Sequence, residues 1–101
     1  MRIRLLFIAL LISTIGFSAP MGTITGVLTD QNTTSKKLSN ATVTIKGTNL
    51  VTNTDADGKY SLSVPAGNYI VEFSLPGYET TEVSVTVKEG EVTIINETLV
   101  S

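Results

Sequence analysis

The chain has 101 residues, a formal net charge of −2, and no Cys, His or Trp. This length fits one domain. Without His and Cys the chain lacks the commonest general base, the commonest metal ligand and a thiolate nucleophile, so we expect no enzyme activity, cofactor or metal site. Seven Lys and Arg against nine Asp and Glu leave no basic surface for nucleic acid.

The N-terminal residues have the pattern of a secretory signal peptide. Arg2 and Arg4 precede an apolar run, LLFIALLI at 5–12, and small residues follow it. We expect a signal-peptide helix cleaved after Ser18, leaving 19–101 as one exported domain, periplasmic or secreted. The run is shorter than the roughly 20 apolar residues that span a bilayer, so we expect no stable membrane span after cleavage. An uncleaved N-terminal anchor is the alternative.

The remainder of the chain alternates apolar and polar residues in short runs, separated by Gly, Pro, Asn and Asp. This spacing is typical of a β-sandwich. Most connections are short, which favours antiparallel neighbours. The sequence therefore predicts an all-β fold, a seven-stranded antiparallel sandwich of two sheets. The expected strands are 23–29, 41–46, 50–54, 59–64, 68–75, 78–88 and 91–100.

Alternation within these strands predicts which side chains form the core. Tyr60, Tyr69 and Phe73 fall on the inward phase of their strands, so we interpret them as core residues rather than as a sugar-stacking platform. Tyr78 follows a Pro-Gly turn. Its hydroxyl is predicted to tie a corner of the sandwich, and it is also our candidate contact residue.

The last predicted strand breaks the alternation. Val92 and Ile94 share one face, whereas Leu99 falls on the other, so we expect a bulge or a change of packing partner near Asn96. In this reading Ile95 points outward.

A second isoleucine, Ile70, also falls on an outward phase. If Ile70 and Ile95 lie together, they would form an apolar patch on which a protein partner could dock. The short, polar strand at 50–54 is a further candidate, as an open edge for β-augmentation.

Two other motifs suggest chemistry that the spacing does not support. The segment 53–58 begins like a calcium loop, but its twelfth position is Val64 instead of a bidentate Glu, so we interpret it as a hairpin turn. Lys46 and Asn96 could in principle join covalently. Lys46 lies on an outward phase and no acid is clearly buried beside it, which disfavours such a bond.

Several of these segments together resemble the carboxypeptidase regulatory-like domain, a transthyretin-like sandwich. The resemblance covers nearly all of 19–101 and implies a non-catalytic accessory module of secreted or envelope proteins. It carries no catalytic residue over to this chain. The segments are ITGVLTD at 24–30, LSNATVTIKGT at 38–48, TDADGKYSL at 54–62, PAGNY at 65–69 and PGYE at 76–79.

The sequence thus favours an exported accessory module that binds a protein partner or has a structural role in the cell envelope. The alternative is a small carbohydrate-binding module of the starch-binding-like type, with a glycan as its ligand. Sugar-binding modules usually display Trp or exposed Tyr, and the chain has no Trp. A transthyretin-like hydrolase would need His, which is also absent.

Overall fold

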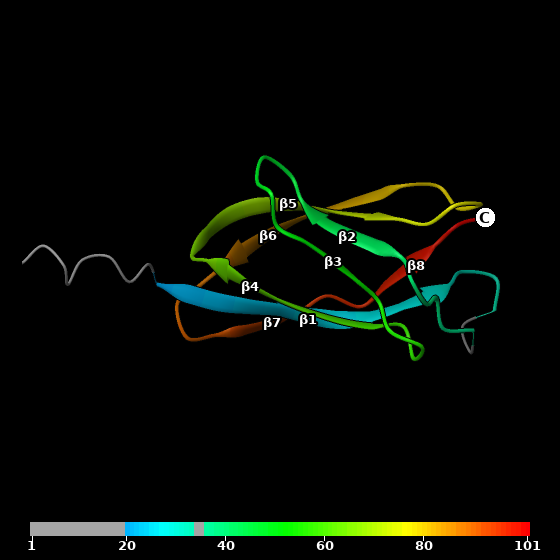
Figure 1. Cartoon of the computed structure of the whole chain (residues 1–101), viewed down its shortest axis with the longest axis horizontal. Coiled ribbons are helices and arrows are strands. Elements are labelled where there is room, and N and C mark those ends of the chain that lie inside the picture. Colours follow the sequence, from blue (N-terminus) through cyan, green and yellow to red (C-terminus); the bar gives the residue numbers. More distant parts are fainter. Residues whose placement is uncertain (1–19, 34–35) are drawn as a thin grey trace, which may run out of the picture.

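A computed structural model describes residues 20–33 and 36–101, so the predicted signal peptide lies outside the described residues. The described chain forms two β-sheets packed face to face, and it contains no helix (Figure 1). The strands are β1 (Met21–Asp30), β2 (Thr42–Ile45), β3 (Val51–Asn53), β4 (Lys59–Pro65), β5 (Gly67–Ser74), β6 (Thr81–Val87), β7 (Val92–Ile94) and β8 (Glu97–Leu99).

The prediction of a two-sheet sandwich is confirmed, with eight strands in place of seven. Sheet 1 has the order β4-β1-β7, with β8 also paired to β1, and sheet 2 has the order β3-β2-β5-β6. The extra strand arises because the predicted strand at 91–100 is interrupted between β7 and β8.

The antiparallel prediction fails at one place. β7 and β8 run parallel to β1, while all other pairs are antiparallel. The chain leaves β6 in sheet 2 and enters β7 in sheet 1, so the turn between them is a crossing between sheets and not a hairpin. Two hydrogen bonds fix this crossing to β1, from Gly90 N–H to the Met21 carbonyl (2.9 Å) and from Thr23 N–H to the Glu91 carbonyl (3.0 Å).

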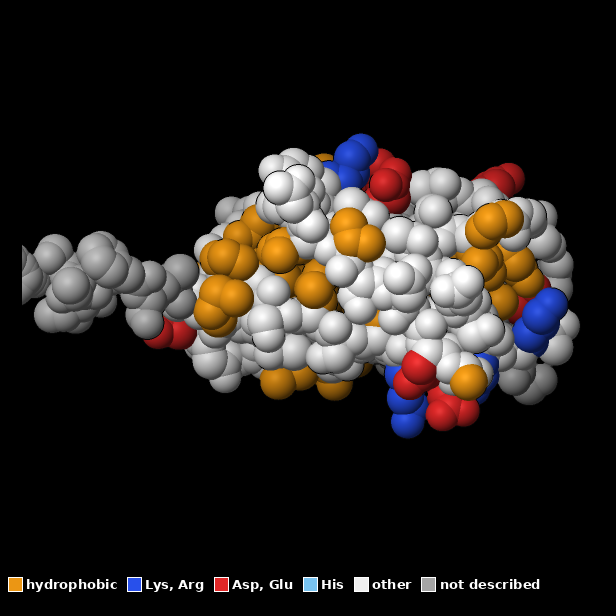
Figure 2. Space-filling view, in the orientation of Figure 1, with side chains coloured by type: hydrophobic (Ala, Val, Ile, Leu, Met, Phe, Trp, Pro, Cys, Tyr) orange, Lys and Arg blue, Asp and Glu red, His pale blue; other side chains and the backbone are white. Residues whose placement is uncertain are grey.

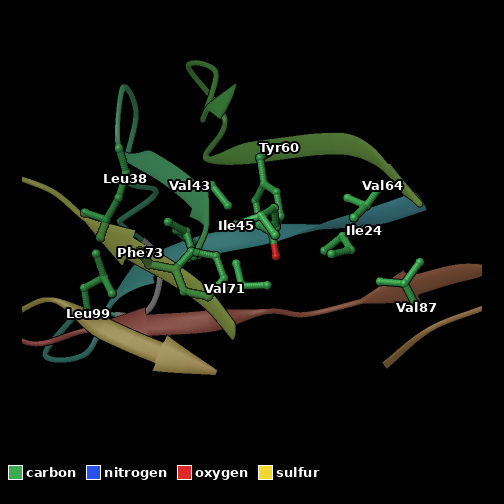
Figure 3. Close-up of a cluster of buried hydrophobic side chains, with 12 residues drawn as sticks. Ile24, Leu38, Val43, Ile45, Tyr60, Val64, Val71, Phe73, Val87 and Leu99 are labelled. Carbon is green, nitrogen blue, oxygen red and sulfur yellow. The ribbon is translucent and has the colours of Figure 1, made fainter. Parts of the chain in front are cut away.

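The core lies between the two sheets, and all its members fall within the eight strands or the loop before β2 (Figure 3). Tyr60 and Phe73 are buried as predicted and meet edge to face, with ring centroids 5.6 Å apart. Tyr69 is half-buried against this core. Residues 20–101 thus contain both sheets and the whole core, so we expect this segment to fold alone. The buried apolar residues are Ile24, Leu28, Leu38, Ala41, Val43, Ile45, Tyr60, Val64, Val71, Phe73, Val87 and Leu99.

The predicted inward phase of the last strand is wrong. Thr23 pairs with Val92 and Leu28 pairs with Glu97, so β7 and β8 keep one register along β1 and no residue is inserted. There is neither a bulge nor a change of partner. Leu99 is buried and Ile95 packs against the core, whereas Val92 and Ile94 are exposed.

A close approach over Gly26 explains why the chain adopts this phase. The Ile95 N–H donates to the Thr25 carbonyl (2.8 Å), and the Tyr60 hydroxyl donates to the Ile95 carbonyl (2.7 Å). The next residue, Asn96, accepts from the Val27 N–H through its side-chain oxygen (3.0 Å). The side-chain oxygen of Asn96 accepts this hydrogen bond in place of a backbone carbonyl. The ladder of backbone hydrogen bonds to β1 is therefore interrupted between β7 and β8, while the register is unchanged.

Gly26 leaves the space that this arrangement needs. A Cβ at residue 26 would lie 1.8 Å from the Ile95 carbonyl oxygen and 3.0 Å from the Tyr60 hydroxyl. Because the nearer obstruction is backbone, no rotamer change can relieve it.

We therefore predict that Gly26→Ala destabilises the domain by about 3 kcal/mol, since the added methyl group must displace the chain at Ile95. Urea unfolding of residues 20–101 measures this change. Gly47→Ala is the matched control. Its Cβ meets nothing within 4 Å, and only its φ of 82° opposes the change, which costs about 1 kcal/mol. Equal unfolding midpoints for the two variants would contradict the close approach at Gly26.

Candidate functional site

The outer surface of sheet 1 carries the two most exposed large apolar side chains among the described residues, Ile94 and Val92, followed by Val51 on sheet 2, which is 50% exposed. Val92, Ile94 and Met21 are 62%, 66% and 43% exposed. They share one side of the sheet because Thr23 pairs with Val92 and Thr25 pairs with Ile94. We call this surface the sheet-1 face. Its members are Met21, Thr23, Thr25, Ser61, Ser63, Val92 and Ile94.

The seven members of the sheet-1 face include no aromatic ring, and the nearest charge on the same outward phase is Lys59, the residue of β4 that pairs with Val27. Single exposed apolar residues are ordinary, but neighbouring ones in an uncharged setting are typical of a protein-binding surface. Apolar side chains project from the lower edge of the molecule in Figure 2, where β7 lies in Figure 1. A surface of this kind can exclude water when it is covered by a partner.

The outer surface of sheet 2 is more polar and holds a shallow depression of about 550 Å³. The Lys46 ammonium contacts the Glu82 carboxylate at 2.7 Å, and both side chains are about half exposed. This hydrogen bond and the negative charge of Glu82 raise the pKa of Lys46. The depression is lined by Lys46, Asn68, Tyr69, Ile70, Ser84, Val85 and Thr86.

The two predicted contact isoleucines do not form a joint patch. Ile70 is 41% exposed and borders the depression on sheet 2. Ile95 belongs to the other sheet and packs against the core. The sequence pattern does not single out Val92 and Ile94 as surface residues, because the more apolar phase of a strand is normally the inward one. If Leu99 is assigned to the inward face of the last strand, alternation along the strand places Ile95 inward and Ile94 outward.

Tyr78 ties a corner of the sandwich, as its place after the Pro-Gly turn predicts. Its hydroxyl donates to Asp30 Oδ2 (2.6 Å), and Oδ1 of the same carboxylate accepts from the N–H groups of Asn32 (2.7 Å) and Thr33 (3.2 Å). Asp30 is buried in this contact. The Tyr78 hydrogen bond is the largest effect that lowers the pKa of Asp30, and it raises the pKa of Tyr78.

The other tyrosine hydroxyls also bind within the domain. Tyr60 donates to Ile95, and Tyr69 donates to the Pro65 carbonyl (2.8 Å). Burial raises the pKa of Tyr60 well above its usual range. Among the described residues, no aromatic ring therefore stands out as a flat platform for a sugar.

The segment that resembles a calcium loop is a tight turn between β3 and β4. The predicted hairpin is wrong, because β3 belongs to sheet 2 and β4 to sheet 1, so the turn crosses between the sheets. Asp55 Oδ1 accepts from the N–H groups of Asp57 (2.8 Å) and Lys59 (2.9 Å), and these bonds lower the pKa of Asp55. Gly58 closes the turn with a φ of 75°. Within 20–33 and 36–101, no three acidic side chains come together in a way that could hold a metal ion.

Lys46 and Asn96 do not meet. The Lys46 ammonium binds Glu82 on the outer surface of sheet 2, whereas the Asn96 side chain binds Val27 in sheet 1. The geometry therefore gives no support to a covalent link between them.

The family model for the carboxypeptidase regulatory-like domain matches residues 23–100. The chain belongs to this family. The match covers every strand of the sandwich, from β1 to β8. No curated protein matches the sequence.

Solved structures from three bacteria share the fold of this carboxypeptidase regulatory-like domain. The Bacillus anthracis TIE protein matches with a TM-score of 0.69 and 23% identity, over 80% of this chain and 17% of that one. A chain in a type II Cohesin–X-Dockerin complex from Acetivibrio cellulolyticus matches with a TM-score of 0.58 and 26% identity, over 75% of this chain and 52% of that one. A DUF3823 family protein from Parabacteroides merdae matches with a TM-score of 0.53 and 20% identity, over 80% and 46%. The domain thus spans about half or less of the length of these chains.

A search for helices able to cross a membrane, made over the described part of the chain, finds none.

The Tyr78–Asp30 contact gives the domain an acid-sensitive corner. The pKa of Asp30 is lower in the folded domain than in the unfolded chain, where it is about 3.9. The ionised Asp30 therefore stabilises the folded domain above the unfolded-state pKa, and this stabilisation is lost as the pH falls through the folded-state pKa. We predict that Tyr78→Phe lowers the Tm by several degrees at neutral pH, and that this difference from the natural chain shrinks in acid. Thermal unfolding from about pH 7 to about pH 2 measures it. A Tm difference that is the same at every pH would show that the hydrogen bond to Asp30 does not stabilise the corner.

Proposed function

We propose that this chain is an exported, non-catalytic accessory module whose transthyretin-like sandwich binds a protein partner through the sheet-1 face. The observation that carries the proposal is the exposure of Val92 and Ile94, 62% and 66%, on the same side of one strand. Burying two such side chains supplies a favourable free energy of about 1.5–3 kcal/mol each. A partner that covers them therefore gains affinity without a charged or catalytic group.

Family membership and one structural likeness support a role in binding. The match to the carboxypeptidase regulatory-like domain favours an accessory role over catalysis. One chain of similar fold comes from a Cohesin–X-Dockerin complex, an assembly of protein with protein. A structural role in the cell envelope is compatible with the same surface, because it also requires contact with other proteins.

The proposed location outside the cytoplasm rests on the N-terminal sequence. The run at 5–12 and the preceding arginines have the pattern of a signal peptide, with cleavage after Ser18 and a mature domain at 19–101.

A glycan-binding role is the alternative, but no contact in the domain favours it. The three tyrosine hydroxyls bind groups of the domain itself, and Tyr69, the one aromatic residue at the depression on sheet 2, is half-buried. Glycan binding that is lost with a change at Tyr69 and kept with changes on the sheet-1 face would replace our proposal.

The sheet-1 face can be tested with a matched pair of variants. Tagged residues 20–101 are incubated with native envelope extract, and bound proteins are identified and quantified by mass spectrometry. We predict that a stoichiometric partner binds the natural sequence and that the double change Val92→Asp and Ile94→Asp weakens its binding at least about tenfold, because two charges must then be desolvated at the contact.

Ile70→Asp is the control, because Ile70 is an exposed isoleucine on the opposite sheet, at 41%. It should leave the binding unchanged. Loss of the partner with Ile70→Asp, together with normal binding by the double variant, would move the site to the depression on sheet 2. Circular dichroism of all three proteins checks that they are folded.

A further inference from the structure

The open edge of sheet 2 at β6 has an unusual combination of length and chemistry. Sheet 2 ends at β6, and among residues 20–33 and 36–101 no strand pairs with its free side. β6 has seven residues, and its sequence TEVSVTV contains no Pro, Lys or Gly. Pro, Lys and Gly are residues that proteins commonly place on an edge strand to prevent its pairing with another chain, and β6 has none of them.

The other sheet edges are less suited to pairing. β3, β7 and β8 have three residues each, and Asn96 separates β7 from β8. β4 is as long as β6, but it begins at Lys59 and ends at Pro65, and it lies close to β3 at the opposite corner of the sandwich. The short edge at β3, which the sequence predicts as an edge for augmentation, is therefore the weaker candidate.

The hydrogen-bond pattern shows which backbone groups of β6 face outward. The Lys46 N–H donates to the Ile70 carbonyl (2.9 Å), so the backbone groups of Ile70 face β2. Backbone direction alternates along a strand, so the neighbours of Ile70 in β5 face β6. The residues of β6 that pair with these neighbours of Ile70 direct their own backbone groups towards β5. The residues between those partners must therefore present their N–H and carbonyl groups at the open edge. These residues are Glu82, Ser84 and Thr86.

β6 is also complementary to itself when reversed. Ser84 is the middle residue of Thr81–Val87, so a second, antiparallel β6 centred there pairs along its whole length. In this register Glu82 lies opposite Thr86 of the other copy, and Val83 lies opposite Val85. Val83 and Val85 are half-buried in one domain, so each would cover the exposed part of the other.

Charge does not oppose this pairing. Glu82 is the one acid in β6, and the Lys46 ammonium of the same domain contacts it at 2.7 Å. In the centred register the two Glu82 residues are four positions apart along the strand, about 13 Å. No like charges therefore lie directly opposite each other.

We propose that the β6 edge binds the β6 edge of a second copy of this chain, forming a two-fold symmetric dimer with one continuous sheet across both domains. The two-fold axis passes beside Ser84. Such an interface is isologous, because the same residues contribute from both copies. It lies on sheet 2, so the sheet-1 face of each copy stays free for a partner.

Charge changes at the two-fold axis test this register. Sedimentation velocity of residues 20–101 from about 1 µM to about 1 mM should show a monomer–dimer equilibrium. Ser84→Lys and Ser84→Glu should each raise the dissociation constant at least about tenfold, because like charges then lie directly opposite each other. An equimolar mixture of the two variants should restore the dimer, because Lys then lies opposite Glu.

Recovery in the mixture separates loss of pairing from loss of folding. A natural sequence that stays monomeric at every concentration would overturn the proposal. So would variants that dimerise as well as the natural sequence, since the contact would then lie elsewhere.

A cysteine at the axis gives a second readout in a protein that is otherwise free of Cys. Ser84→Cys should form a disulfide-linked dimer rapidly on mild oxidation, because directly opposite residues in a hydrogen-bonded pair have Cα atoms about 5.5 Å apart, within disulfide range. Asn53→Cys on the β3 edge is the control, being exposed on the other edge of the same sheet. Equal rates of cross-linking for the two variants would mean random collision and would contradict the dimer.

Discussion

The hydrogen bond from the Tyr60 hydroxyl to the Ile95 carbonyl is the contact on which the arrangement of sheet 1 depends. It joins β4 to the chain between β7 and β8 across the bare backbone of Gly26, so three strands meet at one point. The carbonyl of Ile95 is partly buried and would otherwise lack this partner, and leaving such a group without a partner costs up to about 1–3 kcal/mol. Fixing Ile95 against the core also fixes its neighbours, because side chains alternate along the strand.

The exposed side of β7, which carries the proposed binding surface, follows from this contact. With Ile95 and Leu99 inside, Val92 and Ile94 must lie outside, on the same side as the threonines of β1. The more apolar set of positions in β7 is therefore the one that faces solvent. A strand that exposes Val and Ile while pointing a threonine, Thr93, towards the core gives up burial in the free domain. Burial against the proposed protein partner would recover it, which is the physical reason for the proposal that the partner binds the sheet-1 face.

The sequence predicted most of the fold because most strands alternate without ambiguity. Tyr60, Phe73 and Leu99 illustrate the limits. The first two lie in strands whose apolar residues fall mainly on one face, with Ile70 as the exception beside Phe73, so their burial could be read from the pattern. In the last strand both phases carry apolar residues, and the choice depends on Gly26, which is far away in the sequence. The corner made by Tyr78 was predictable from the turn before it. The pairing potential of β6 was not, because it depends on which backbone groups β5 leaves free.

The phase of the last strand can be measured directly, because the chain has no Cys. Single variants Ile94→Cys and Ile95→Cys are made in residues 20–101, checked for folding, and reacted with a thiol reagent. The structure predicts that the thiol at 94 reacts at nearly the rate of a free thiol, while the thiol at 95 reacts at least about tenfold more slowly, because it is shielded against the core. Equal rates, or faster reaction at 95, would contradict both the anchoring at Tyr60 and the sheet-1 face that depends on it.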